Sequence, residues 1–470
     1  MEWLDLGGIG SKTLNLAKGA VDQGDSFLNE TVIKLAITGL SRSGKTVFIT
    51  SMIQNLLAMG DRKNSLPALT ARLQSQKGTR LRDVRILPAG IEQIPWFDLK
   101  AKLEVLSSDK PEWPRPTDDL ATISLMITME RPDDWGRTLI KRFGMKERRI
   151  KLEILDYPGE WLVDLPLLSM SYRDWSRSAL ELARAEPRAP CFEEFNQYVA
   201  ASISPGAKPN ESLIKGAHLL FRQGLMKCRE SLGLQFLQPG RFICPGPKGG
   251  EIPLLWFFPL DNGEAAPRSG STAELLANRF ESYKMFIRRD FFDTHFMQFN
   301  RQILLVDVLT ALYKGRLIFE DTGRAIGEIA KALASQKITK LAIAATKADH
   351  VPSRSRDNLA SLARDLTKRA FNGRADEEDI FHAIASIDST EASVLTIGDQ
   401  QVTAVCGMVE GKMRPYHVGE VPMKMPEKEY FQYKLFNLPG FEPRRFSPDT
   451  QVIRNVGIDK VLDVVIGDSL

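Results

Sequence analysis

One stretch, Gly39-Leu40-Ser41-Arg42-Ser43-Gly44-Lys45-Thr46, constrains this chain more than any other. It follows an apolar run at 32–38 that predicts a short buried strand, and it precedes a helical pattern that ends near Gly60. Strand, G-x-x-x-x-G-K-[ST], helix is the arrangement of a phosphate-binding loop, in which backbone N–H groups surround phosphate oxygens at a helix N-terminus. Lys45 is expected to reach the terminal phosphates and the Thr46 hydroxyl to bind Mg²⁺. The predicted nucleotide-binding residues here are Gly39, Ser41, Arg42, Ser43, Gly44, Lys45 and Thr46.

Composition is that of an ordinary soluble protein and narrows the classes of partner. The chain has 470 residues, of which 43% are hydrophobic and 26% are charged. With 63 basic and 59 acidic residues the net charge is only +4, so no nucleic-acid partner is expected. The four cysteines are scattered without metal-ligand spacing, and no apolar run approaches the roughly 18 residues of a membrane span. No signal peptide is evident, so a cytoplasmic protein is predicted, with peripheral contact to a membrane left open.

Hydrophobic periodicity predicts a sheet covered by helices. Two alternating segments joined by a polar connection are expected to pair as antiparallel strands. Later apolar strands alternate with helical patterns, which is typical of a mainly parallel sheet with helices on both faces. The predicted strands are 32–38, 123–129, 150–155, 303–309, 340–345 and 381–387, and the predicted helices after the phosphate loop are 47–57, 319–334 and 356–371. The expected fold is therefore α/β.

The same patterns divide the chain into a core interrupted by insertions. The core is predicted in three parts, at 31–59, 117–164 and 299–391. Between these parts lie an insertion at 60–116, with a short helix near 97–106, and a mainly helical insertion at 165–298, with breaks near 187–190 and 205–206 and a short strand within 239–272. A β-containing extension at 392–450 and a helix at 451–470 end the chain. Residues 1–30 form an arm that packs on the body or on a second subunit of a homodimer, or else an amphipathic helix on a membrane.

Two later motifs extend the predicted site. Asp156-Tyr157-Pro158-Gly159-Glu160 stands at the end of a predicted strand, where the carboxylate can hold Mg²⁺ through water and the Gly159 N–H can bind the γ-phosphate. Thr346-Lys347-Ala348-Asp349 also follows a strand. Asp349 there can accept hydrogen bonds from the N1–H and 2-amino groups of guanine, which adenine does not offer at those places. The Lys347 stem can lie over the base, with its head tied back to the phosphate loop. Ser386 and Ile387 suit the loop whose backbone meets the guanine oxygen.

These three motifs, in this order at strand ends, resemble those of the Ras-like GTPases. The long insertions and the spelling Asp156-Tyr157-Pro158-Gly159-Glu160-Trp161 are similar to the bacterial YcjX family of stress-associated P-loop proteins. That resemblance implies a Ras-like fold, GTP or GDP with Mg²⁺ as ligands, slow hydrolysis, and a role in a bacterial stress response. It also implies that the protein is located near the inner membrane. The insertions are natural surfaces for a protein partner, such as an inner-membrane stress protein.

The sequence also offers candidates for the residues that would act in hydrolysis. A switch threonine, expected to hold Mg²⁺ and take part in hydrolysis, is assigned to Thr117, with Thr122 as the alternative. Glu160 stands where Ras-like enzymes carry a water-orienting glutamine, and its charge would repel the γ-phosphate, so slow turnover is expected. Arg42 is either a cis arginine finger, as in guanylate-binding proteins, or a solvent-facing residue.

Two rival functions remain open from the sequence. In a P-loop ATPase or kinase, the segment at 346–349 would be an ordinary turn and Asp307 would supply the magnesium carboxylate. In a nucleotide-gated scaffold, Glu160 and the large insertions would accompany negligible catalysis. Nucleotide preference and single-turnover hydrolysis discriminate among the three.

Overall fold

The centre of the fold is a single sheet. The computed structural model describes residues 30–75, 80–88, 95–115, 120–130, 147–246, 252–263, 267–293, 296–334, 338–371 and 380–470. Within these ranges seven strands form one sheet in the order β2-β3-β4-β1-β5-β6-β7. The strands are β1 (Glu30–Gly39), β2 (Arg80–Ile86), β3 (Ala121–Glu130), β4 (Glu147–Asp156), β5 (Arg301–Val306), β6 (Lys340–Ala345) and β7 (Phe381–Ala383).

Strand directions match those expected from the sequence. β1 runs parallel to β4 and β5, and β5, β6 and β7 continue the parallel part. β3 pairs antiparallel with β4, as the hairpin-like connection predicts, and β2 adds a further antiparallel edge strand. The carboxyl ends of β1, β4, β5, β6 and β7 therefore lie along one edge of the sheet, and the predicted α/β class is confirmed.

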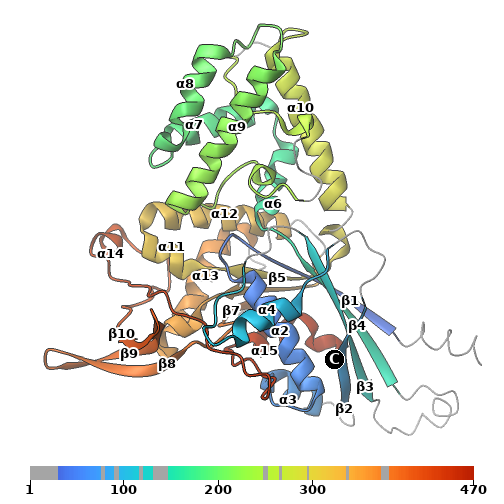
Figure 1. Cartoon of the computed structure of the whole chain (residues 1–470), viewed down its shortest axis with the longest axis vertical. Coiled ribbons are helices and arrows are strands. Elements are labelled where there is room, and N and C mark those ends of the chain that lie inside the picture. The colour runs from blue at the N-terminus through green and yellow to red at the C-terminus, as the bar shows by residue number, and fades with distance from the viewer. Residues whose placement is uncertain are drawn as a thin grey trace, which may run out of the picture.

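Helices cover both faces, because successive apolar side chains of each central strand point in opposite directions. On β5, Ile303 and Leu305 join the core under α2 (Lys45–Gly60), α3 (Pro67–Ser75) and α15 (Ile458–Ile466). Leu304 and Val306 join the core under α11 (Val308–Lys314), α12 (Arg316–Ala334) and α13 (Arg356–Phe371). Figure 1 shows the two helical layers on either side of the sheet.

A group of helices stands above the α12 layer and corresponds to the predicted helical insertion (Figure 1). It contains α7 (Tyr172–Arg184), α8 (Glu193–Ser202), α9 (Glu211–Lys227) and α10 (Thr272–Ile287). Its interior is aromatic: the Trp175 and Phe280 rings stack at 5.2 Å, and Phe257 packs edge-on against Trp175. One continuous apolar core runs from these rings to the sheet. The predicted strand within 239–272 is wrong for the described residues, where short 3₁₀ turns at Gly240–Phe242 and Pro253–Leu255 occur instead.

Three other elements differ from the sequence prediction. β2 lies in a segment whose sequence is polar, yet it pairs with β3. It also packs closely on α2, as shown by Gly60, where a side chain would lie 2.6 Å from the Val84 nitrogen. The strand predicted at 303–309 stops at Val306, because the Asp307 carboxylate caps α11 by accepting a hydrogen bond from the Thr310 N–H at 3.0 Å. α3 is also absent from the prediction, whereas the short helix near 97–106 is confirmed as α4 (Leu99–Ser107).

The C-terminal part adds a small antiparallel sheet and returns to the main one. β8 (Thr390–Ile397), β9 (Gln400–Val409) and β10 (Lys412–Tyr416) form three strands in the order β10-β9-β8, followed by α14 (Lys428–Gln432). The predicted β-containing extension and the final helix are both confirmed. No helix in the described ranges is both long enough and apolar enough to cross a membrane.

Candidate nucleotide-binding site

A cavity of about 650 Å³ opens at the carboxyl edge of the sheet. It is bounded by the loop after β1, the turn after β4, the segments that follow β6 and β7, and residues from distant insertions. The structure thus collects motifs that lie more than 300 positions apart in the chain. The sequence-predicted residues that line this cavity are Gly39, Ser41, Arg42, Ser43, Gly44, Lys45, Thr46, Glu160, Thr346, Lys347, Asp349, Ser386 and Ile387.

The loop between β1 and α2 has the backbone shape of a phosphate cradle. Gly44 caps α2 with φ +82°, a left-handed conformation that favours glycine. Its carbonyl accepts the first hydrogen bond of the helix, from the Phe48 N–H at 2.8 Å. The loop therefore leads directly into a helix N-terminus whose backbone dipoles favour an anion.

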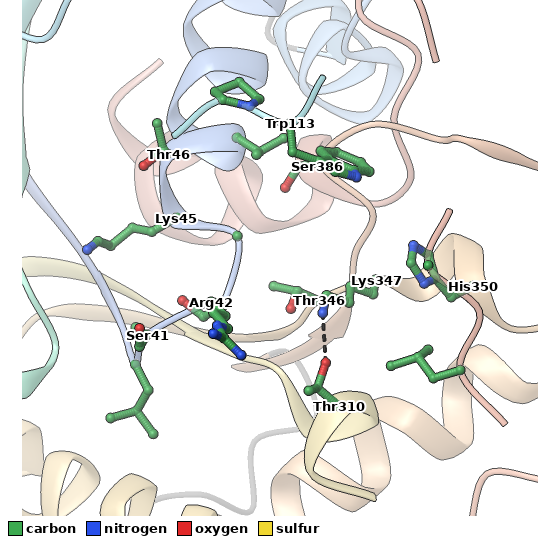
Figure 2. A pocket seen from close by; sticks show the side chains of 18 of the residues that line it. Ser41, Arg42, Lys45, Thr46, Trp113, Thr310, Thr346, Lys347, His350 and Ser386 are labelled. Atoms are coloured by element: carbon green, nitrogen blue, oxygen red, sulfur yellow. Dashed lines mark hydrogen bonds between the residues drawn. The ribbon is translucent and has the colours of Figure 1, made fainter. Parts of the chain in front are cut away.

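An ion pair joins the cavity-lining Lys45 to the end of β4. Lys45 Nζ lies 3.3 Å from Asp156 Oδ1, and the Asp156 side chain is only 2% exposed. β4 and β1 are neighbours, with Ile37 opposite Asp156, so the sheet itself brings this carboxylate beside the loop. Figure 2 shows Lys45 and Thr46 on the loop at this end of the cavity. A threonine hydroxyl and a carboxylate are hard oxygen donors, so this pair of residues fits a magnesium ion.

The turn after β4 touches the loop directly. A side chain at Gly159 would lie 2.6 Å from the Gly39 carbonyl carbon and 3.0 Å from the Leu40 nitrogen, so only glycine permits this approach. Gly159 caps the short helix α6 (Glu160–Val163). Glu160 is buried and lines the cavity. A movement of the turn after β4 would therefore displace the backbone of the loop after β1.

The opposite end of the cavity carries the third motif. Asp349 follows β6, is 2% exposed, and accepts a hydrogen bond on Oδ2 from the Ser389 N–H at 3.0 Å. Burial raises the pKa of its carboxyl group, and the neighbouring His350 opposes that rise. The other oxygen, Oδ1, lies 3.9 Å from His350 Nε2. Ser386 and Ile387, after β7, line the same end.

Lys347 corrects one detail of the sequence interpretation. Its ammonium does not contact the phosphate loop, and it donates instead to Asp307 Oδ2 at 2.6 Å and to Thr310 Oγ1 at 2.7 Å (Figure 2). The side chain of Asp307 is only 8% exposed, so its negative charge is poorly solvated and attracts the Lys347 ammonium. Asp307 thus both caps α11 and holds Lys347, whereas Asp156 pairs with Lys45 of the phosphate loop motif.

The two threonine candidates stand differently. Thr117 lies outside the described residues. Thr122 belongs to β3, where its hydroxyl donates to the Ile154 carbonyl at 3.1 Å and its N–H donates to the Pro95 carbonyl. Thr122 thus serves the sheet, which favours Thr117 as the residue to be tested.

Several residues that line the cavity belong to no sequence motif, so the sequence analysis could not predict them. Trp113 donates its indole N–H to the Phe441 carbonyl at 2.9 Å, and the Phe441 ring packs edge-on against His350. Both aromatic residues line the cavity beside Asp349, although one comes from the first insertion and the other from the C-terminal extension. Arg229, from the helical insertion, also lines the cavity. Only the folded chain places these segments together.

The fold and site define a P-loop protein of the Ras-like class: phosphate loop after β1, D-x-x-G after the adjacent β4, and T-K-x-D after β6. The chain belongs to the YcjX-like family, DUF463, which it matches over residues 33–470. It is 32% identical over 462 residues to a protein of Escherichia coli (strain K12) named Ras-like GTPase YcjX, covering 93% of this chain and 96% of that protein. It is 30% identical over 479 residues to the Shewanella oneidensis protein of the same name, covering 95% of this chain and 96% of that protein.

Proposed function

We propose that this chain binds GTP with Mg²⁺ and hydrolyses it slowly to GDP and phosphate, acting as a nucleotide-dependent switch. The observation that carries the proposal is one cavity lined both by Lys45, which pairs with Asp156 behind it, and by the buried Asp349 carboxylate. The names of the two curated relatives, both called Ras-like GTPases, support the same activity.

In this proposal the phosphate end works by electrostatics. Backbone N–H groups of the loop bind the β-phosphate, and the Lys45 ammonium moves from Asp156 to the phosphate oxygens. Thr46, Asp156 and Thr117 are the residues proposed to hold Mg²⁺, which when bound supplies positive charge against the β- and γ-phosphates. The Gly159 N–H binds the γ-phosphate, so loss of that group releases the turn after β4.

Guanine recognition is assigned to the other end. Asp349 accepts from the N1–H and the 2-amino group, while Lys347 covers the base and the backbone at Ser386 and Ile387 meets the 6-oxo group. Burial of Asp349 makes this selective, since adenine would bring no donors to the carboxylate oxygen that Ser389 leaves unbonded.

The proposed rate is low because Glu160 replaces the usual glutamine. Its carboxylate can accept a hydrogen bond from the attacking water, but its charge opposes the approach of the γ-phosphate. Arg42 is proposed as a phosphate contact, since it lies in the loop and lines the cavity.

A nucleotide titration and a single-turnover assay test the proposal together. The wild type should bind GTP far more tightly than ATP and should release phosphate, and Lys45→Ala should lose both activities. Lys100→Ala removes the same charge from an exposed position, where the side chain is 88% accessible, and should behave like the wild type. Equal affinity for ATP and GTP would remove the guanine assignment.

A second candidate, a nucleotide-gated scaffold, is favoured by the buried Glu160 beside a large insertion. It is distinguished by GTP binding without phosphate release above buffer in the wild type and in Glu160→Gln. The proposed cellular setting rests on the family resemblance alone: a cytoplasmic, peripherally membrane-associated stress-response switch whose insertions contact a protein partner.

A further inference from the structure

We propose that Arg229, carried by the helical insertion, is a catalytic residue that donates to the γ-phosphate in the transition state of hydrolysis. The inference rests on the proposed GTP hydrolysis and adds a residue that none of the three motifs contains. Its starting point is that Arg229 lines the same cavity as Lys45, Thr46 and Glu160, although it lies 69 positions beyond Glu160.

The local backbone presents Arg229 in an unusual way. α9 does not stop at Lys227 but continues into a π-helical turn at Cys228–Leu232, closed by a hydrogen bond from the Gly233 N–H to the Cys228 carbonyl. Such turns displace the side chains that follow from the regular helical positions and occur frequently at functional sites. A side chain at Gly233 would meet the Lys314 ammonium, so the turn packs directly on α11 beside the cavity.

The Arg229 side chain is linked to the γ-phosphate-sensing turn through one short segment. Its Nη1 donates to Cys244 Sγ at 3.4 Å, and the Cys244 carbonyl accepts from the Trp161 indole N–H at 2.7 Å. Trp161 immediately follows Glu160 in α6. Arg229 is therefore positioned relative to the residues that would orient the attacking water.

A buried polar network holds that segment in place. The Arg241 guanidinium lies 3.4 Å above the Trp161 ring. The fully buried Asp164 carboxylate accepts from the Gly240 N–H at 2.7 Å and from the Tyr283 hydroxyl at 2.7 Å. A side chain at Gly240 would lie 2.7 Å from the Glu160 carbonyl carbon, so segment and α6 are in direct contact. Fixed positioning of this kind is what electrostatic stabilisation of a transition state requires.

Charge explains why a second cation is needed there. In hydrolysis the water oxygen forms a bond to the γ-phosphorus, the bond to the β–γ bridging oxygen breaks with its electron pair left on GDP, and both water protons are retained on the released phosphate as H₂PO₄⁻. Negative charge grows on the bridging oxygen while Glu160 adds a further negative charge nearby. A guanidinium offers five donors in a planar fork and stabilises such oxygens without losing a proton.

Arg42 is the less suitable residue for this role. It is exposed, and it also lines a small second cavity that faces α11, next to Asp307 and Lys314. Burial, and after it repulsion from Arg42, lowers the pKa of Lys314, so the two cations are neighbours on that side. The structure assigns the transition-state contact to Arg229 and leaves Arg42 to ground-state phosphate binding.

Single-turnover hydrolysis and GDP–aluminium fluoride binding test the assignment. Arg229→Ala should keep the affinity for GTP within a few-fold of the wild type, lose about 10³-fold or more in hydrolysis rate, and no longer bind GDP more tightly when aluminium fluoride is added. Arg229→Lys should recover little, because an ammonium lacks the planar fork. Added guanidinium ion should partly restore Arg229→Ala.

Matched variants and the wild type separate the possible failures. Lys227→Ala removes a positive charge two residues away, on the side chain that pairs with Glu194 at the surface, and should hydrolyse GTP normally. Hydrolysis and aluminium fluoride binding that survive in Arg229→Ala would overturn the inference while leaving the proposed GTPase intact. A wild type that binds GTP but does not hydrolyse it would overturn the hydrolysis in the proposed function, and the inference with it.

Discussion

Replacing Asp349 by asparagine is the most direct test of how this site distinguishes guanine from other nucleotide bases. Asp349 Oδ2 is held by the Ser389 N–H at 3.0 Å, a bond that the carbonyl oxygen of asparagine can accept equally well. The substitution keeps the volume of the side chain, so the fold should tolerate it. The amide NH₂ then replaces Oδ1 toward the cavity, and a donor faces the base in place of an acceptor.

The expected loss of affinity follows from burial. The proposal gives Asp349 two hydrogen bonds to guanine, and hydrogen bonds to a charged group contribute about 1.5–3 kcal/mol each. Because the residue is only 2% exposed, solvent cannot replace them. Asp349→Asn should therefore weaken GTP binding by about 10²–10⁴-fold and favour XTP, whose 2-oxo group accepts from the new amide.

Isothermal titration with GTP, XTP and ATP measures the effect. Asp388→Asn serves as the control, since Asp388 lies close by but forms an ion pair with Arg454 at 2.8 Å, and its preference among the three nucleotides should not change. If Asp349→Asn binds GTP as tightly as the wild type, or loses all three nucleotides equally without unfolding, the assignment of the base pocket is wrong.

Two further predictions concern residues that only the structure brought forward. Burial raises the pKa of Asp164 to about 6 from its ordinary 3.8, so between these values the unfolded chain releases the proton first and stability falls as pH rises. This loss amounts to roughly 3 kcal/mol. Urea unfolding at pH 3.5 and at pH 7 measures this effect. Between these two pH values the free energy of unfolding of the wild type should fall by that amount relative to Asp164→Asn, and a pH-independent difference would contradict the prediction. Trp113 lines the cavity and contacts Phe441, so the change in tryptophan emission on GTP addition should be smaller in Trp113→Phe than in the wild type. A change of the same size in both proteins would place the base elsewhere.

Most of the core elements could be predicted because local sequence determined them. β5 and β6 are apolar along most of their length, the helices have clear periodicity, and β6 and α13 begin and end where the pattern predicts. β2 was not predictable in this way, because an edge strand with one exposed face can carry charged side chains such as Arg82 and Asp83. The early end of β5 depends on Asp307, whose capping role appears only once α11 is formed.

In the candidate site, too, the contiguous motifs could be predicted and the contacts between separate elements could not. Lys45, Asp156, Gly159 and Asp349 belong to contiguous motifs at strand ends, and parallel strands bring such ends to one edge of the sheet whatever lies between them. The partners of those side chains are another matter, as Lys347 shows, since its choice of Asp307 over the phosphate loop follows from distances between separate elements.

By itself the sequence determined that a triphosphate-binding loop is built into an α/β sheet, because the chemistry of that loop needs only neighbouring residues. Tertiary structure decided what surrounds it. Trp113, Phe441 and Arg229 reach the cavity from three separate parts of the chain, and nothing in their local sequence distinguishes them from surface or core residues. Contacts across such sequence separations depend on how whole elements pack, which short-range pattern cannot encode.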